Sequence, residues 1–162
     1  MTAHRSPAAA GTLEPEFTAA LKTMFEERIV FNQLLGLQIT AIAAEGVAAR
    51  LPMRPELIGH FAHQRLHGGV TSATLDALGG LAVMAAIGAR HLDEPVMTRM
   101  MRFGRLGTID LRVDYLRQAI GAHFTARAQV LRLGSRVAST RMEFLGADGE
   151  LLATGAAAYI VS

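Results

Sequence analysis

The 162-residue chain contains no cysteine and no tryptophan, and Lys22 is its only lysine. Without cysteine there is no disulfide framework, no zinc–thiolate site and no thiol nucleophile. Only 6% of the residues are aromatic and 19% are charged, with neither a run of basic residues nor a ladder of aromatic ones. Such patterns favour nucleic-acid binding. We therefore expect no nucleic-acid partner and no thiol chemistry.

Apolar residues make up 51% of the chain, and its length is typical of one domain with a sizeable core. The formal net charge is only +2, but every basic residue apart from the single lysine is an arginine. The planar guanidinium binds phosphates and carboxylates bidentately, so an anionic ligand is one interpretation. The other is a general bias in base composition, and the sequence leaves both open.

The first residues, Met1–Leu13, are small and polar and include proline and glycine. They predict a flexible tail, residues 1–13, followed by a single domain over residues 14–162. The tail has no apolar segment of the kind found in secretory signals, so we expect a cytoplasmic protein.

A twenty-residue segment, Val70–Ala89, is long and apolar enough to resemble a membrane span. Three hydroxyl residues dilute its first half, small residues dominate where lipid would favour large ones, and Asp76 would cost about 2.5–3.5 kcal/mol in hydrocarbon. A helix enclosed by a sheet is also apolar on all sides. We predict a central helix from about Gly68 to Arg90 and no membrane span.

The remaining pattern predicts an α+β fold in which an antiparallel sheet wraps around that helix. Before the helix we expect an N-terminal helix, two strands and a loop; after it, an irregular connection and four strands. The expected boundaries are Glu14–Glu27, Leu37–Ala43, Val47–Met53, Arg54–Leu66, Leu92–Gly107, 108–117, Phe124–Val130, Val137–Leu145 and Leu151–Val161. One sheet cannot cover the helix on every side, so we expect a second copy to complete its burial.

The strongest candidate for chemistry is His67-Gly68-Gly69 at the start of the long helix, together with Asp76 inside it. Backbone N–H groups at a helix start lack intrahelical partners, and we expect two consecutive glycines to leave them open to polarise a carbonyl oxygen. Asp76 is a candidate base or nucleophile. The alternative is structural, in which the carboxylate satisfies a neighbouring backbone group or an arginine.

Gly68 and Asp76 lie eight residues apart, which is roughly 12 Å along a helix. Both cannot contact one reacting carbonyl, which needs partners about 3 Å away. A shared substrate therefore requires two chains with antiparallel helices, and this places the site at a two-fold dimer interface.

Other chemistries are less well supported. His60, His63 and His67 have a spacing that suits a metal on a helix, but Pro55 and Gly59 indicate a loop, and no carboxylate lies between Glu56 and Asp76, so we expect no metal site. The nucleophile motif Gly-x-Ser-x-Gly and the phosphate-binding glycine motifs are absent.

The motif Leu66-His67-Gly68-Gly69-Val70, with Asp76 nine residues after His67, resembles the PaaI-like acyl-CoA thioesterases of the hot-dog fold superfamily. The strand over residues 108–117, the turn over residues 134–138 and the last strand with Ala153–Gly155 also resemble this family. The similarity extends from about Phe31 to Ser162.

The resemblance implies a sheet of five or six strands around one helix, assembled into homodimers and often dimers of dimers. It implies hydrolysis of an acyl-CoA to a free acid and CoA without a metal or organic cofactor. Asp76 would be the base or nucleophile, the Gly68 amide would polarise the thioester carbonyl, and His67 would shape the turn. Thr108 matches a residue that orients water from the partner chain, and Gly69 would bind substrate.

Relatives often carry an asparagine six or seven residues before the motif histidine, where this chain has His60 and Phe61. His60 or Gln64 is then the candidate substitute in substrate binding. Arg132 and Arg136, or the arginines between residues 99 and 105, are candidate contacts for the CoA phosphates.

Small residues around the helix suggest an apolar tunnel for a medium or longer acyl chain. Two alternatives share this fold: a non-catalytic acyl-CoA-binding or sensing module, which would not need Asp76, and a dehydratase or hydratase, which would need a histidine–acid pair.

Overall fold

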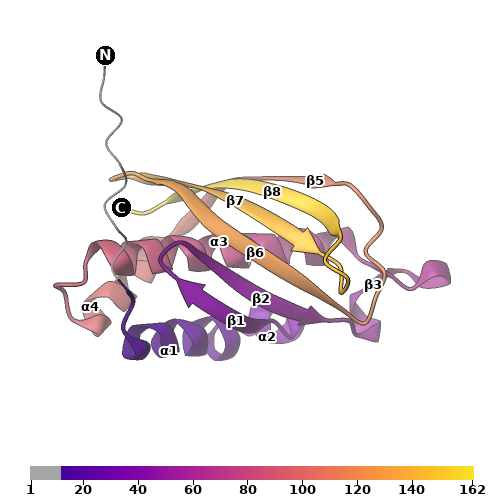
Figure 1. Ribbon diagram of the computed structural model, residues 1–162, viewed down its shortest axis with the longest axis horizontal. Coiled ribbons are helices and arrows are strands. Elements are labelled where there is room, and N and C mark those ends of the chain that lie inside the picture. The colour runs from indigo at the N-terminus through magenta and orange to yellow at the C-terminus, as the bar shows by residue number, and fades with distance from the viewer. Residues whose placement is uncertain (1–11) are drawn as a thin grey trace, which may run out of the picture.

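The computed structural model describes residues 12–162 and contains a six-stranded antiparallel sheet curled around one long helix (Figure 1). The strand order is β1-β2-β6-β7-β8-β5, so the first strand after the long helix lies at the sheet edge opposite β1. The strands of this sheet are β1 (Gln38–Ala43), β2 (Gly46–Pro52), β5 (Gly107–Tyr115), β6 (His123–Leu133), β7 (Val137–Leu145) and β8 (Leu151–Ile160). The α+β hot-dog architecture expected from the sequence is confirmed.

The long helix α3 (Gly68–Arg90) begins and ends where the sequence predicted. It packs against all six strands of the sheet, and in its most apolar 18-residue window 67% of the residues are buried. Length and composition alone would allow this helix to cross a membrane, but the burial identifies it as the core helix of a globular domain.

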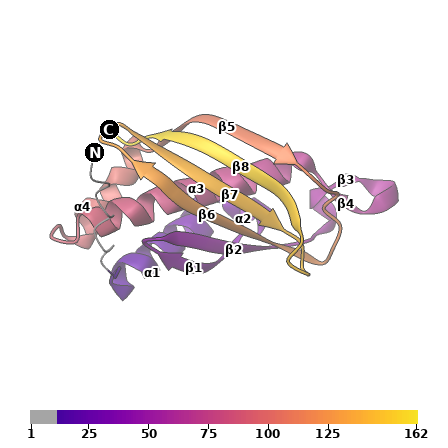
Figure 2. The same cartoon turned by 45° about the horizontal axis from the view of Figure 1, so that its top comes forward.

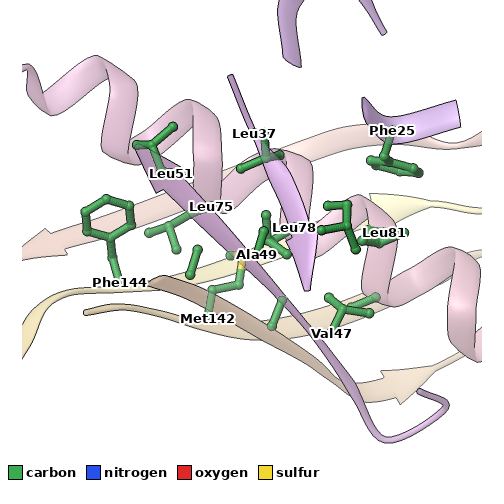
Figure 3. Close-up of a cluster of buried hydrophobic side chains, with 14 of the residues drawn as sticks. Phe25, Leu37, Val47, Ala49, Leu51, Leu75, Leu78, Leu81, Met142 and Phe144 are labelled. Carbon is green, nitrogen blue, oxygen red and sulfur yellow. The ribbon is translucent and has the colours of Figure 1, made fainter. Parts of the chain in front are cut away.

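The core lies between α3 and the concave face of the sheet. Figure 3 shows Leu75, Leu78 and Leu81 of α3 together with Met142 and Phe144 of β7. All five side chains are almost completely buried. Alternating strand positions supply this face, because successive side chains on a strand point to opposite sides of the sheet.

The N-terminal helices cover the side of α3 that the sheet leaves open (Figures 1 and 2). They are α1 (Pro15–Thr23), the π-helical turn η1 (Met24–Arg28) and α2 (Val30–Leu35). The buried Asn32 donates a hydrogen bond to the Phe25 carbonyl (2.9 Å), which ties α2 to η1. Leu13, expected in the flexible tail, is instead buried in the core, and residues 1–11 of that tail lie outside the described residues.

The connection after α3, expected to be irregular, contains α4 (Val96–Met101) and the 3-10 turn η4 (Arg102–Arg105). Arg99 holds it in place: its side chain is almost fully buried, forms an ion pair with Glu14, and lies 4.5 Å from the Phe17 ring centroid. A buried guanidinium needs such partners, because leaving it unpaired would be costly.

The segment 54–66, expected to be a loop, forms two short antiparallel strands, β3 (Ile58–His60) and β4 (Arg65–Leu66). The 3-10 turn η2 (Pro55–Leu57) precedes β3, and the 3-10 turn η3 (Phe61–His63) joins the two strands. It projects from the end of the molecule opposite α4 (Figure 2). The His67 N–H donates to the Leu57 carbonyl (2.9 Å), which fixes the direction in which the chain enters α3.

Candidate active site

The start of α3 is capped by the side chain of His67. Its Nδ1 accepts a hydrogen bond from the Gly69 N–H (2.9 Å), as an N-cap residue does for an amide in the first turn. A Cβ on Gly69 would lie 2.9 Å from that same nitrogen, so the cap requires glycine. The expectation that both glycine amides are open to a ligand is therefore wrong for Gly69, whose N–H is already occupied.

Gly68 differs from Gly69. Within residues 12–162 its N–H has no hydrogen-bond partner, while its carbonyl accepts a hydrogen bond from the Tyr115 hydroxyl (2.7 Å). Tyr115 thus holds the peptide in place from β5. Gly68 lines an open hollow of about 430 Å³ together with Arg65, Arg117 and Thr71. This is the arrangement needed to polarise a carbonyl oxygen from outside the helix.

Asp76 lies two turns further along α3 and is half-buried. Its Oδ1 accepts hydrogen bonds from Thr108 Oγ1 (2.8 Å) and from the Tyr159 hydroxyl (3.2 Å). No donor within residues 12–162 reaches Oδ2. One oxygen of the carboxylate is therefore fixed in position and the other remains available for a proton or for an electrophilic carbon.

Tyr159, on β8, also donates to the Asp76 backbone carbonyl (3.0 Å). Its ring lies directly against Gly79, where a Cβ would overlap the hydroxyl. Burial, followed by the nearby Asp76 charge, raises the pKa of the Tyr159 phenol above its ordinary value. The phenol therefore remains a protonated donor to Asp76 at all physiological pH values.

Asp76 borders a cavity of about 270 Å³ between α3, the N-terminal helices and the start of β5. Its polar groups are mainly Asp76, Thr108 and the Tyr159 hydroxyl, which are hydrogen-bonded to one another. The other lining residues are largely apolar: Phe25, Ile29, Phe31, Asn32, Ala73, Ala77, Gly80, Phe103, Leu106 and Gly107.

The structure brings Thr108 to Asp76 but keeps Gly68 apart from both. Thr108 contacts Asp76 of its own chain, whereas the resemblance implied a role toward the partner chain. Gly68 and Asp76 line two separate hollows. This agrees with the roughly 12 Å that eight helical residues span.

The proposed substitutes for the missing asparagine lie elsewhere. The His60 ring stacks on that of His63, with centroids 4.8 Å apart, and Gln64 Nε2 donates to the Phe61 carbonyl (2.8 Å). Neither His60 nor Gln64 lines the hollow at Gly68 or the cavity at Asp76.

The candidate arginines for binding the CoA phosphates lie in two places, the β6–β7 hairpin and the segment after α3. Arg132 and Arg136 are exposed on the β6–β7 hairpin. Arg90 at the C-terminal end of α3 contacts this hairpin, so the hairpin lies far from Gly68. Among the alternatives between residues 99 and 105, Arg99 is buried in its pair with Glu14. Arg102 is bound to Glu94, whose pKa it holds below the ordinary value.

Sequence reasoning missed the two tyrosines, which are the only ones in the chain. Tyr159 occupies an inward position of β8 in a row of small residues, Ala153, Gly155 and Ala157. A phenol at such a position needs a hydrogen-bond partner. The nearest helix offers one carboxylate, so this signal could have linked Tyr159 to Asp76.

Comparison with known proteins identifies the family. Residues 63–153 match the model of the thioesterase superfamily. The chain is 36% identical over 138 residues to the medium/long-chain acyl-CoA thioesterase YigI of Escherichia coli, covering 85% of this chain and 89% of that protein. The Salmonella typhimurium protein of the same name is also 36% identical over the same length.

Solved structures agree with this result. A Shewanella oneidensis protein related to the thioesterase superfamily superposes with a TM-score of 0.85 at 39% identity, covering 92% of this chain and 99% of that one. A protein from Syntrophus aciditrophicus gives a TM-score of 0.82 at 35% identity, covering 91% and 97%. With its sheet-wrapped helix, its capped His67-Gly68-Gly69 turn and its held carboxylate, the chain belongs to the thioesterase superfamily.

Proposed function

We propose that this protein is an acyl-CoA thioesterase that hydrolyses medium- to long-chain acyl-CoA to a free fatty acid and CoA. The observation that carries the proposal is the Asp76 carboxylate, held at Oδ1 by Thr108 and Tyr159 at the edge of an apolar cavity. The 36% identity to YigI, which is named for this activity, supports the choice of substrate. A cytoplasmic location is part of the proposal, because CoA thioesters are intracellular metabolites.

The active site in this proposal is shared between two copies of the chain. The open N–H of Gly68 in one copy polarises the thioester carbonyl, and Asp76 of the other copy acts on its carbon. Asp76 either removes a proton from the attacking water or attacks the carbonyl carbon itself. In both routes the C–S bond breaks, water supplies the new acid oxygen, and the CoA sulfur leaves with a proton. A carboxylate and an amide suffice, so we assign no metal or organic cofactor.

The first experiment measures the release of free CoA thiol by the purified protein from acyl-CoAs of increasing chain length. We expect turnover that rises from short to medium or long chains. The proposal fails if no chain length yields free CoA.

A second experiment tests the shared site. Proline suits the first residue of a helix but has no N–H, so Gly68→Pro removes the donor at a tolerated position. We expect Gly68→Pro and Asp76→Asn each to abolish most activity. When the two variants are mixed and allowed to exchange subunits, about a quarter of wild-type activity should return, because half of the dimers then contain one intact site.

The matched variant Gly68→Ala keeps the N–H, and its activity should clearly exceed that of Gly68→Pro. If the mixture stays inactive although mass spectrometry shows mixed dimers, the site lies within one chain and the shared arrangement is wrong.

A further inference from the structure

The cavity at Asp76 has one polar end and an otherwise largely apolar wall. On α3 it is lined by Ala73, Asp76, Ala77 and Gly80, which recur at the spacing of one helix face. Asp76 is the only charged group among the lining residues. Any ligand that reacts at Asp76 would therefore place its adjoining part against small and apolar side chains.

No close packing contact requires a glycine at position 80. A Cβ at this position would meet only Leu106 Cδ2 at 3.5 Å, an ordinary van der Waals contact, whereas a Cβ on the preceding Gly79 would overlap Tyr159. Glycine is among the least favourable residues in a helix interior. Its effect at position 80 is to leave space in the cavity about one turn beyond Asp76.

We propose that this cavity binds the alkyl part of the acyl chain and that Gly80 sets the length of chain accepted. The inference rests on the thioesterase function proposed above and adds the specificity determinant to it. The chain enters beside Asp76 and runs past Ala77 toward Gly80 and Leu106. About 6 Å of helix separates Asp76 from Gly80, so the chain reaches Gly80 several bonds after the thioester carbon.

The other side of the cavity comes from the N-terminal segment. Phe25 and Phe103 meet edge to face, with ring centroids 5.8 Å apart and an interplanar angle of 74°, and so bridge η1 and η4. Phe31 of α2 also lines the cavity but is 55% exposed, which places it at the border with solvent. The segment before β1 and η4 together therefore supply the wall that turns the face of α3 into a binding site.

The size of the cavity agrees with an alkyl chain as its occupant. Its volume of about 270 Å³ lies just below the roughly 300–1,000 Å³ range of small-molecule pockets. It is therefore suited to part of a ligand, and the bulky, charged CoA moiety must lie outside it.

The test is the chain-length profile of Gly80→Ala, measured as kcat/KM from butanoyl-CoA to hexadecanoyl-CoA. One methyl group in an apolar pocket discriminates by about tenfold or more. We expect the ratio of hexadecanoyl-CoA to butanoyl-CoA turnover to fall at least about tenfold relative to wild type, with butanoyl-CoA hydrolysis little changed. The larger Gly80→Val should move the preferred length to still shorter chains.

Binding measurements distinguish a change in chain-length specificity from a change in the chemical step. Alkyl-CoA thioethers lack the carbonyl and cannot be hydrolysed, so their affinity reports on the cavity alone. In wild type we expect the affinity to increase with each methylene up to a limit, and in Gly80→Ala this limit should come at a shorter chain. Gly104→Ala is the matched control, since a Cβ on Gly104 meets nothing within 4 Å and Gly104 does not line the cavity.

Two results would overturn the inference while leaving the thioesterase function intact. They are an unchanged chain-length profile in Gly80→Ala and an equal loss at every length. If the unchanged profile comes with a weaker dimer, a partner side chain fills the cavity. Wild-type protein that hydrolyses no acyl-CoA would instead refute the proposed function itself.

Discussion

Two faces of α3 contain the same kinds of small and apolar residues, but one face is tightly packed and the other borders a cavity. On the face toward β7 and β8, Gly79 lies in direct contact with the Tyr159 ring and Met142. On the next face, Gly80 borders a cavity, and an added Cβ would meet a single atom at van der Waals distance. Adjacent glycines in one helix therefore serve different purposes: the first permits close approach and the second preserves space.

Asp76 lies where these two faces meet. The packed face supplies its hydrogen-bond donor Tyr159, and the open face supplies the cavity that Asp76 borders. A rigid support on one side and an accessible oxygen on the other are what a catalytic carboxylate needs. The two faces of α3 together therefore position Asp76.

The largest effect should come from Asp76 itself. Asp76→Asn keeps an acceptor for Thr108 and Tyr159 but removes the base or nucleophile, so we expect kcat to fall by about 10²–10⁴-fold with little change in stability. Thiol-release kinetics and a urea titration measure the two quantities. Asp110→Asn, an exposed carboxylate on β5, is the control. Full activity in Asp76→Asn would show that Asp76 is neither the base nor the nucleophile.

The next largest effect should come from filling the packed face. In Gly79→Ala the new methyl group would overlap Tyr159, and overpacking of this kind costs about 1–3 kcal/mol. Displacement of the Tyr159 hydroxyl from Asp76 should lower kcat as well. Urea unfolding followed by circular dichroism gives the stability change. Stability equal to that of wild type would mean that Tyr159 is free to move and does not hold Asp76.

Much of this arrangement could be predicted from sequence because it depends on local patterns. The largely apolar segment over residues 70–89 predicted α3, alternation predicted the strands, and the His67-Gly68-Gly69 motif identified the helix start. Asp76 was recognisable as the only charged residue in the apolar segment 70–89. Each of these signals involves residues that are close together in the chain.

The rest could not be predicted because it depends on long-range contacts. Tyr159 lies 83 residues from Asp76, and Arg99 lies 85 residues from Glu14, so neither partner shows in a local window. The same holds for Gly79 and Gly80, whose roles depend on what packs against them. The arginines between residues 99 and 105 had the composition of a phosphate site, but Arg99 is buried in its ion pair with Glu14 and Arg102 is paired with Glu94. Arg105 of η4 is exposed.

A smaller effect should follow from removing only the hydroxyl that links the packed face to Asp76. Tyr159→Phe should lower stability at pH 8 by about 0.5–1.5 kcal/mol through the lost hydrogen bonds. The pKa of Tyr159 is raised in the folded state relative to about 10 in the unfolded chain, so the wild type loses stability as the pH rises above 10. The variant lacks this group, and the stability gap between the two proteins should therefore narrow between pH 8 and pH 11.

Urea titrations at the two pH values measure this change. Thr108→Val, which removes the other donor to Asp76 Oδ1 without removing a titrating group, is the control, and its gap to wild type should stay constant. If the stability difference between wild type and Tyr159→Phe increases with pH, the phenol is not a buried donor.

The smallest effect should come from a substitution on the open face, and it should increase stability instead of lowering it. Gly80→Ala places a methyl group in unfilled space and replaces a flexible residue in a helix interior, so stability should rise by roughly 0.5–1 kcal/mol. For a domain of this size the thermal midpoint should increase by about 1–4 °C at a fixed protein concentration. One methyl group should thus destabilise the protein at position 79 and stabilise it at position 80. A lower midpoint for Gly80→Ala would show that position 80 is as tightly packed as position 79, and the cavity could not then accommodate an acyl chain.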